Sequence, residues 1–361
     1  MIIESVKLNN FRNYEEMEIP LNPGTNIFHG KNAQGKTNIL EAVYLCGTTR
    51  SHRQAKDREM IRFGEEEAHI RMQLLKRDNP YRIDMHLKKS RAKGIAINAV
   101  PIRRASELVG LGTFVFFSPE DLNIIKNSPA ERRRFLDMHL CQMSTHYLQN
   151  LSGYQKALLQ RNHLLKDLSF HPEYLDTLDV WDAQLVRYGT AVMRERQKFV
   201  SQFAEKVRKV HASLTGEREE LVLTYENNVG IFSFAEQLFE NRQRDIRMKI
   251  TSCGPHRDDL SFLISGVDIR RYGSQGQQRT AALSAKLAQI EMFREKTQDT
   301  PVLLLDDVLS ELDSDRQHYL LNSIENIQTL ITCTGVEDFI ENRFPIDSLF
   351  LVNDGNVLKE S

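Results

Sequence analysis

The 361-residue sequence lacks several features that would place it in a specialised class of protein. Its four cysteines, Cys46, Cys141, Cys253 and Cys333, are widely spaced and form no CxxC pair, which argues against a zinc site or a disulfide framework. No apolar run approaches the roughly 20 residues that a membrane-spanning helix needs. A basic stretch followed by an apolar core, the mark of a secretory leader, is also missing from the N-terminus. We therefore expect a cytoplasmic protein with no membrane partner.

An excess of one charge is absent as well. Lysine and arginine total 48 and aspartate and glutamate 49, so the net charge is −1. Any binding to DNA must therefore depend on local basic patches and not on global charge. At 40% apolar and 27% charged residues, the composition is that of a folded protein. The length is typical of two to three domains at roughly 150 residues each.

The hydrophobic pattern changes twice along the chain. Apolar residues alternate with polar ones over 70–74 and 83–87, with a turn expected at Asp78, Asn79 and Pro80 between them, which predicts an antiparallel hairpin. From about 119 to 243 the composition is helical, and an apolar stripe from Trp181 to Val210 predicts one helix of about thirty residues. The last third returns to an α/β pattern, in which the apolar run 302–305 predicts a strand buried on both faces.

A phosphate-binding loop is predicted between an N-terminal strand and a helix. Its residues match the pattern G-x-x-x-x-G-K-[ST]: Gly30, Lys31, Asn32, Ala33, Gln34, Gly35, Lys36 and Thr37. The alternative, a glycine-rich turn that caps an ordinary helix, does not require this strand–loop–helix context. Backbone N–H groups would surround the phosphates, Lys36 would reach the β and γ phosphates, and the Thr37 hydroxyl would bind Mg²⁺. We predict an ATP site with Mg²⁺.

A second acidic motif completes this prediction. The run 302–305 ends in Asp306, which would hold Mg²⁺, and Asp307 would orient or deprotonate the attacking water. An aspartate that caps a helix after a core strand is the alternative. Because roughly 265 residues separate the two motifs, far more than a compact nucleotide-binding core of about 150 residues, the helical middle is interpreted as an insertion. The predicted domains are a head of residues 1–117 and 247–361 and a helical arm of residues 118–246.

A third motif lies just before the acidic strand and begins a helix. Ser274 and Gly276 offer a hydroxyl and bare backbone N–H groups at the helix N-terminus. A simple capping turn is the alternative, but the order of the motifs resembles that of an ABC-type ATPase. In that family the Ser-x-Gly signature contacts the γ-phosphate held by the other subunit, so the resemblance implies that Ser274, Gln275, Gly276 and Gln277 act in trans. Residues 310–313 resemble the D-loop of the same superfamily.

Further motifs narrow the resemblance. Residues 10–14 are similar to the opening strand of SMC-like heads, and Arg12 within them is predicted to join the nucleotide site. With residues 116–122, 132–137 and 254–260, they make the chain resemble the bacterial RecF family. The resemblance implies an ABC-type P-loop ATPase head, with a mixed-sheet lobe and an α/β lobe, and no long coiled coil. It also implies ATP-dependent homodimers, weak DNA-stimulated hydrolysis, binding to double-stranded and gapped DNA, and cooperation with RecO and RecR in loading RecA.

Three positions depart from the wider ABC pattern. Asp307 stands where glutamate is usual, Thr334 stands where many transporters carry a histidine that senses the γ-phosphate, and no Q-loop glutamine is evident near 117–120. Two alternatives therefore stay open: the ATPase subunit of a transporter, and a DNA scaffold that binds ATP without productive hydrolysis. The long amphipathic stretch argues against the transporter.

Two basic clusters are candidates for DNA contacts. The first is an acid-free stretch that contains Lys88, Lys89, Arg91 and Lys93; a solvated hairpin face is its alternative. The second is Arg132, Arg133 and Arg134, which follow a predicted capping box at residues 128–131. Cations in the first turn of a helix oppose its dipole. The second cluster therefore predicts an anionic partner, either DNA or an acidic surface across a dimer, against ordinary surface charge.

Overall fold

The computed structural model describes residues 1–336, 339 and 344–360, and the chain divides into two compact units. Unit 1 comprises residues 1–121 and 289–361, and unit 2 comprises residues 122–288. Within the described residues, no helix is both long and apolar enough to cross a membrane.

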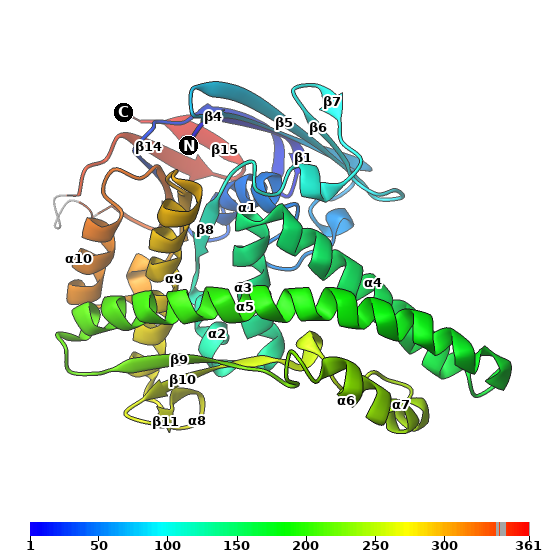
Figure 1. Cartoon of the computed structure of the whole chain (residues 1–361). Helices are drawn as coiled ribbons and strands as arrows, with labels where there is room; N and C mark the ends of the chain where they lie inside the picture. The colour runs from blue at the N-terminus through cyan, green and yellow to red at the C-terminus, as the bar shows by residue number, and fades with distance from the viewer. Residues whose placement is uncertain (337–338, 340–343, 361) are drawn as a thin grey trace. The chain divides into compact units, whose positions relative to one another are not determined.

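The nucleotide-binding half of unit 1 is a mostly parallel six-stranded sheet (Figure 1). Its order is β15 (Asn356–Lys359), β14 (Ser348–Asn353), β3 (Thr25–His29), β13 (Thr329–Cys333), β12 (Val302–Asp306) and β8 (Phe114–Phe117). Every residue of β12 is buried, as predicted from its continuous apolar run. Since β13 lies between β3 and β12, the loop after β3 and the acidic end of β12 meet at one edge of the sheet.

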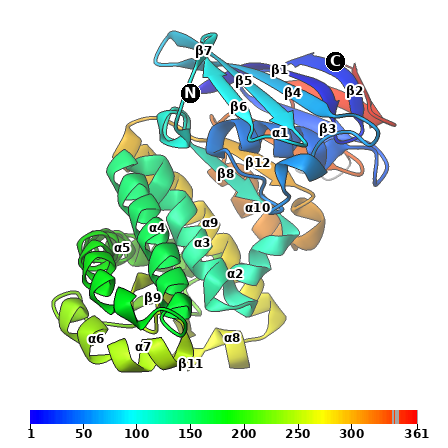
Figure 2. The same ribbon diagram turned by 90° about the vertical axis from the view of Figure 1, so that its right-hand side faces the viewer.

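The second sheet of unit 1 is antiparallel (Figure 2). Its order is β2 (Tyr14–Pro20), β1 (Ile2–Phe11), β4 (Glu67–Lys76), β5 (Asn79–Lys88), β6 (Gly94–Ile97) and β7 (Val100–Pro101). The predicted hairpin is confirmed as β4–β5, but its turn is Arg77–Asp78, both at positive φ. Two such residues make a tight turn whose twist matches the strands, so Asn79 and Pro80 already belong to β5. Helix α1 (Lys36–Thr48) contacts strands of both sheets.

Unit 2 consists of helices around one small sheet. Its long helix α5 (Leu178–Thr215) confirms the predicted apolar stripe, which is buried at Leu185, Val192, Phe199 and Phe203. Helix α4 (Thr145–Asp167) packs against α5. The sheet has the order β11 (Val267–Asp268), β10 (Asp259–Ile264) and β9 (Leu221–Glu226). The other helices are α2 (Asn123–Lys126), α3 (Pro129–Met143), α6 (Phe234–Glu240), α7 (Arg242–Met248), α8 (Ile269–Tyr272) and α9 (Gln275–Thr297), which continues into unit 1, where α10 (Ser314–Ser323) also lies.

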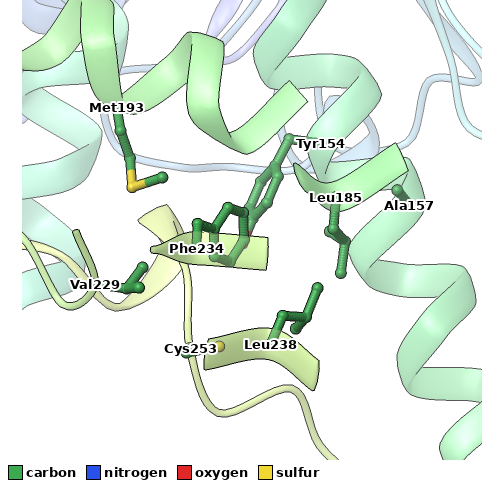
Figure 3. Close-up of a cluster of buried hydrophobic side chains, with 8 residues drawn as sticks. All are labelled: Tyr154, Ala157, Leu185, Met193, Val229, Phe234, Leu238 and Cys253. Carbon is green, nitrogen blue, oxygen red and sulfur yellow. The ribbon is translucent and has the colours of Figure 1, made fainter. Parts of the chain in front are cut away.

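A hydrophobic cluster joins α4, α5 and α6 (Figure 3). Phe234 lies at its centre and approaches α5 closely, because a Cβ at Gly189 would lie 2.6 Å from the Phe234 ring. The cluster consists of Tyr154, Ala157, Leu185, Met193, Val229, Phe234, Leu238 and Cys253. It fixes the segment between β9 and β10 against the two long helices.

The boundaries of the compact units differ in part from the predicted domains. The first segment of the head ends near residue 120 in both divisions: at 117 in the prediction and at 121 in the structure. Residues 247–288 were predicted to belong to the head, whereas in the structure they pack within unit 2. Strand β10 continues the α/β pattern of the last third, but it pairs with β9, a strand of the helical middle. Their functional assignment to the head stays a prediction.

Candidate nucleotide-binding site

The loop between β3 and α1 has the strained backbone that its glycines allow. Gly30, Ala33 and Gly35 have φ values of 143°, 65° and 111°. A Cβ at Gly30 would lie 2.4 Å from the carbonyl oxygen of Val352, and one at Gly35 would lie 2.5 Å from Nδ2 of Asn13. The first turn of α1 carries no side-chain cap and no acidic residue. Asn38 donates its N–H to the carbonyl oxygen of Gly35, and no side chain competes with an anion for the N–H groups before it.

A cavity of about 200 Å³ lies over this loop. Lys36 folds back over the loop and donates to the carbonyl oxygens of Gly30 at 2.5 Å and Lys31 at 2.8 Å. Burial lowers the pKa of Lys36, and the nearby Asp307 partly opposes that change. The lining residues are Asn32, Ala33, Gln34, Gly35, Lys36, Thr37, Asn38, Arg53, Asp306, Asp307 and Thr332.

Thr37 and Asp306 form a site that fits Mg²⁺. Oγ1 of Thr37 donates to Oδ1 of Asp306 at 2.6 Å, and Oγ1 of Thr332 donates to the same oxygen at 2.7 Å. Burial raises the pKa of Asp306, although both hydroxyl groups favour its ionised form. One carboxylate and one hydroxyl, with phosphate oxygens and water, are a usual ligand set for Mg²⁺. The described residues contain no cluster of three or more His, Cys, Asp or Glu side chains that would bind a metal without such a substrate.

Asp307 occupies an unusual backbone conformation. Its φ is 52°, and its N–H points at both the carbonyl oxygen and Oγ1 of Thr332, at 3.2 and 3.1 Å. A non-glycine residue in this region costs of order 1–3 kcal/mol, which is typical of functional sites. The turn directs residue 307 to the cavity that Lys36 and Thr37 line. A water held there would have a carboxylate within the same cavity.

The motif at residues 10–14 holds the phosphate-binding loop in place through hydrogen bonds. Asn13 donates from Nδ2 to the carbonyl oxygen of Gln34 at 2.9 Å, and the Tyr14 hydroxyl donates to that of Gly35 at 3.1 Å. Arg12 binds Glu41 of α1 through two hydrogen bonds of 2.8 Å and is not among the residues that line the cavity. Its role in binding nucleotide therefore stays a prediction, and its observed contacts are structural.

The signature residues lie at the start of helix α9 in unit 2, where Ser274, Gln275 and Gly276 are exposed and Gln277 is half-buried. Oγ of Ser274 accepts from the N–H of Gln277 at 3.1 Å, and Oε1 of Gln277 accepts from the N–H of Ser274 at 2.9 Å. This reciprocal pair is a capping box, so the capping alternative is correct as a description of the turn. A Cβ at Gly276 would meet only Oγ of Ser274, at 3.8 Å. The packing of the chain itself therefore does not require glycine at 276.

The first basic cluster lies where β5 ends and β6 begins. Lys88 pairs with Glu67 at 3.2 Å, Lys89 pairs with Glu66 at 3.1 Å, and Lys93 pairs with Asp57 at 2.8 Å. Arg91 is exposed and has no ion-pair partner among the described residues. The acid-free stretch is therefore largely neutralised by acids from residues 57–67, and Arg91 is its strongest candidate for a phosphate contact.

The prediction that Arg132 contacts DNA is wrong. Arg132 is 1% exposed and binds Asp259 at 2.6 and 3.0 Å. The anionic partner predicted for Arg132, in the first turn of α3, is thus the Asp259 carboxylate of the same chain. The predicted capping box is also not formed, because Ser128 makes no side-chain bond to the first turn. Arg133 donates to the carbonyl oxygen of Asp258 at 2.7 Å, and Arg134 lies 3.9 Å from Glu131.

Comparisons with known proteins now define the family. The family model described as RecF/RecN/SMC N terminal domain matches residues 2–349. The chain is 57% identical to the DNA replication and repair protein RecF of Agathobacter rectalis and 44% identical to that of Clostridium acetobutylicum, each over 99% of both chains. The chain belongs to the RecF family.

Solved structures agree with this assignment. The structure of the recombination mediator protein RecF with ATP, from the RecFOR pathway, superposes with a TM-score of 0.94 at 34% identity over 100% of this chain and 98% of that one. An SMC head bound to a domain of ScpA has a TM-score of 0.59 at 16% identity, which supports the fold alone. The predicted ABC-type head without a long coiled coil is confirmed.

Three residues that line the cavity were missed from the sequence: Asn38, Arg53 and Thr332. Arg53, in the loop after α1, lines the cavity and contributes a positive charge beside Asp306. Thr332, in β13, bonds to Asp306 and Asp307, whereas the Thr334 that the sequence analysis considered is exposed and does not line the cavity. All five residues of β13 are buried. From the sequence, Thr332 could therefore not be told apart from an ordinary residue of a buried strand.

Proposed function

We propose that this RecF-family protein is an ATP-dependent DNA-binding protein of DNA replication and recombinational repair. ATP joins two copies of the chain, the dimer closes on duplex DNA near single-strand/double-strand junctions, and slow, DNA-stimulated hydrolysis releases it. RecO and RecR are the proposed partners, with loading of RecA at gaps as the outcome. The observation that carries the ATP site is the meeting of Thr37, Asp306 and Asp307 over a phosphate-binding loop.

The roles within this cavity follow from chemistry. Lys36 exchanges the carbonyl oxygens of Gly30 and Lys31 for the β and γ phosphates, a change that a flexible ammonium group makes at low cost. Thr37 and Asp306 hold Mg²⁺, which neutralises phosphate charge when it is bound. Asp307 orients or deprotonates the attacking water. Its side chain is one methylene shorter than the usual glutamate, which supports a slow reaction.

The proposal that the signature acts across a dimer is supported by Gly276. The residue is exposed, and a side chain there would meet nothing closer than 3.8 Å in its own chain. A bare backbone with free space in the isolated chain suits the close approach of a phosphate from outside. The capping box leaves the hydroxyl hydrogen of Ser274 to donate, because its oxygen already accepts from Gln277. Family membership argues against the transporter alternative.

Sedimentation with increasing ATP, with and without gapped DNA, tests the proposal. We expect monomers without ATP, dimers with it, and tighter dimers with DNA. Ser274→Arg should bind ATP as a monomer but form no dimers, and Lys36→Arg should bind ATP with slower turnover. Isolated monomers that hydrolyse ATP at the full rate at every dilution would contradict the shared site. Dimers that form with ATP but show no turnover on gapped DNA would favour the non-hydrolysing scaffold.

A further inference from the structure

The first turn of α9 is held by a side chain from the short loop that follows the long helix α5. Nε2 of Gln277 donates to Oε1 of Glu219 at 2.9 Å. The other oxygen of Glu219 lies 3.4 Å from Nε2 of His211, a fully buried residue in the last turns of α5. Glu219 itself belongs to the short loop that connects α5 to β9. A carboxylate thus links the arm helix to the signature turn.

The direction of each hydrogen bond makes this link specific. The amide of Gln277 has two ends: the NH₂ end donates to Glu219, so the oxygen end must face the N–H of Ser274. If the amide rotated by half a turn, its NH₂ would oppose that N–H and the capping box would open. An acceptor at 219 is therefore what fixes the orientation of the Gln277 amide.

The buried ring of His211 lies beside Glu219. Ser284 of α9 uses its hydroxyl hydrogen on the carbonyl oxygen of Thr280 at 2.7 Å, so its oxygen is an acceptor for Nδ1 of His211 at 3.1 Å. The imidazole is thereby fixed between α9 and Glu219. The carboxylate, 28% exposed, accepts from Gln277 and has its other oxygen 3.4 Å from the buried His211 ring, so Gln277 loses its acceptor if the carboxylate turns to solvent.

We propose that Glu219 is a positioning residue for the signature. It acts through Gln277 to keep Ser274 and the free N–H groups beside it arranged for a phosphate of the partner copy. The proposal deepens the proposed function and rests on it, since the effect of Glu219 on dimerisation requires a signature that acts in trans. It also gives the arm a route to the ATP site, because Glu219 lies in the short loop after the C-terminal end of α5.

The first test uses monomers without ATP, so that it does not depend on dimerisation. Hydrogen exchange of a peptide covering residues 272–278 should be several-fold faster in Glu219→Ala. Glu219→Gln, which keeps an acceptor oxygen, should exchange as the wild type does. Glu220→Ala, which removes the neighbouring exposed carboxylate, is the matched control and should change nothing. Unchanged exchange in Glu219→Ala would overturn the proposal.

The second test measures ATP-dependent dimerisation. Glu219→Ala should weaken the dimer about tenfold, the effect of losing one hydrogen bond to a charged group, while ATP affinity of the monomer stays within about twofold. Glu219→Gln should restore dimerisation. In a Gln277→Ala background Glu219→Ala should have no further effect, and an additive loss would show that Glu219 does not act through Gln277. A wild type that fails to dimerise with ATP would refute the proposed function itself, while the exchange test still decides the positioning of the turn.

Discussion

Replacing Arg12 by alanine should destabilise unit 1 strongly, because it leaves a buried carboxylate alone. Glu41 is fully buried, and Arg12 supplies two of its hydrogen bonds at 2.8 Å, while Oγ of Ser51 supplies a third at 2.5 Å. Removing one partner of a buried pair costs about 3–5 kcal/mol. Since the Arg12 side chain is 20% exposed, we expect the lower end, about 3 kcal/mol.

The pH dependence of this loss has a definite sign. Burial alone would raise the pKa of Glu41, but the hydrogen bonds from Arg12 and Ser51 outweigh it and hold the pKa below its usual value. Glu41 therefore stabilises the wild type above the carboxyl's unfolded pKa, and this stability is lost as the pH falls through the folded pKa. Without the hydrogen bonds of Arg12, the effect of burial dominates and the pKa of Glu41 rises. The variant therefore loses stability as the pH increases. The difference between the two proteins should thus be larger at pH 8 than at pH 5.

Urea unfolding at both pH values, followed through a signal from unit 1, measures the effect. Arg62→Ala is the matched control, because its ion pair with Glu15 at 3.1 Å is largely exposed and should contribute less than about 1 kcal/mol. Equal losses in the two variants, or a difference that does not change with pH, would refute the reasoning. ATP affinity measured below the unfolding transition then tests whether Arg12 also binds nucleotide.

Three further predictions concern other residues. Gly276→Ala should leave the monomer as stable or up to about 1 kcal/mol more stable, yet prevent ATP-dependent dimers, whereas Gly273→Ala should lower the melting temperature because its Cβ would lie 2.6 Å from the carbonyl oxygen of Ile269. Arg132→Ala should cost about 3 kcal/mol by urea unfolding without changing DNA affinity at low temperature; a selective loss of DNA binding would show that Arg132 contacts DNA. Arg91→Ala should make the slope of log affinity against log salt shallower by about 0.9, and an unchanged slope would remove Arg91 from the DNA surface.

The sequence predicted those parts of the site that follow from local pattern. The loop 30–37 and the pair Asp306 and Asp307 are defined by spacing and by the strands before them, and the structure brings residues 32–37 of the loop and both aspartates into one cavity. Arg53 and Thr332 were missed because their place depends on how α1 and β13 pack, which no spacing records. Arg132 was misjudged for the same reason: its partner Asp259 lies 127 residues further along the chain. The predicted residues follow from local sequence motifs. The missed residues owe their roles to contacts between distant parts of the chain, which helix and strand propensities do not reveal.

The central position of β3 has a consequence for how the protein is made. Both hydrogen-bonded neighbours of β3 are strands of the last third, β13 and β14, and Thr25 pairs with Thr329, a separation of 329 − 25 = 304 residues. At roughly 5–20 residues per second, a ribosome needs about 15–60 s to supply that partner. During this time an apolar strand and the loop after it wait unpaired on the nascent chain. Chaperones that shield such segments should therefore decide the yield of active protein, and chains that terminate before β13 should be degraded without ever holding nucleotide.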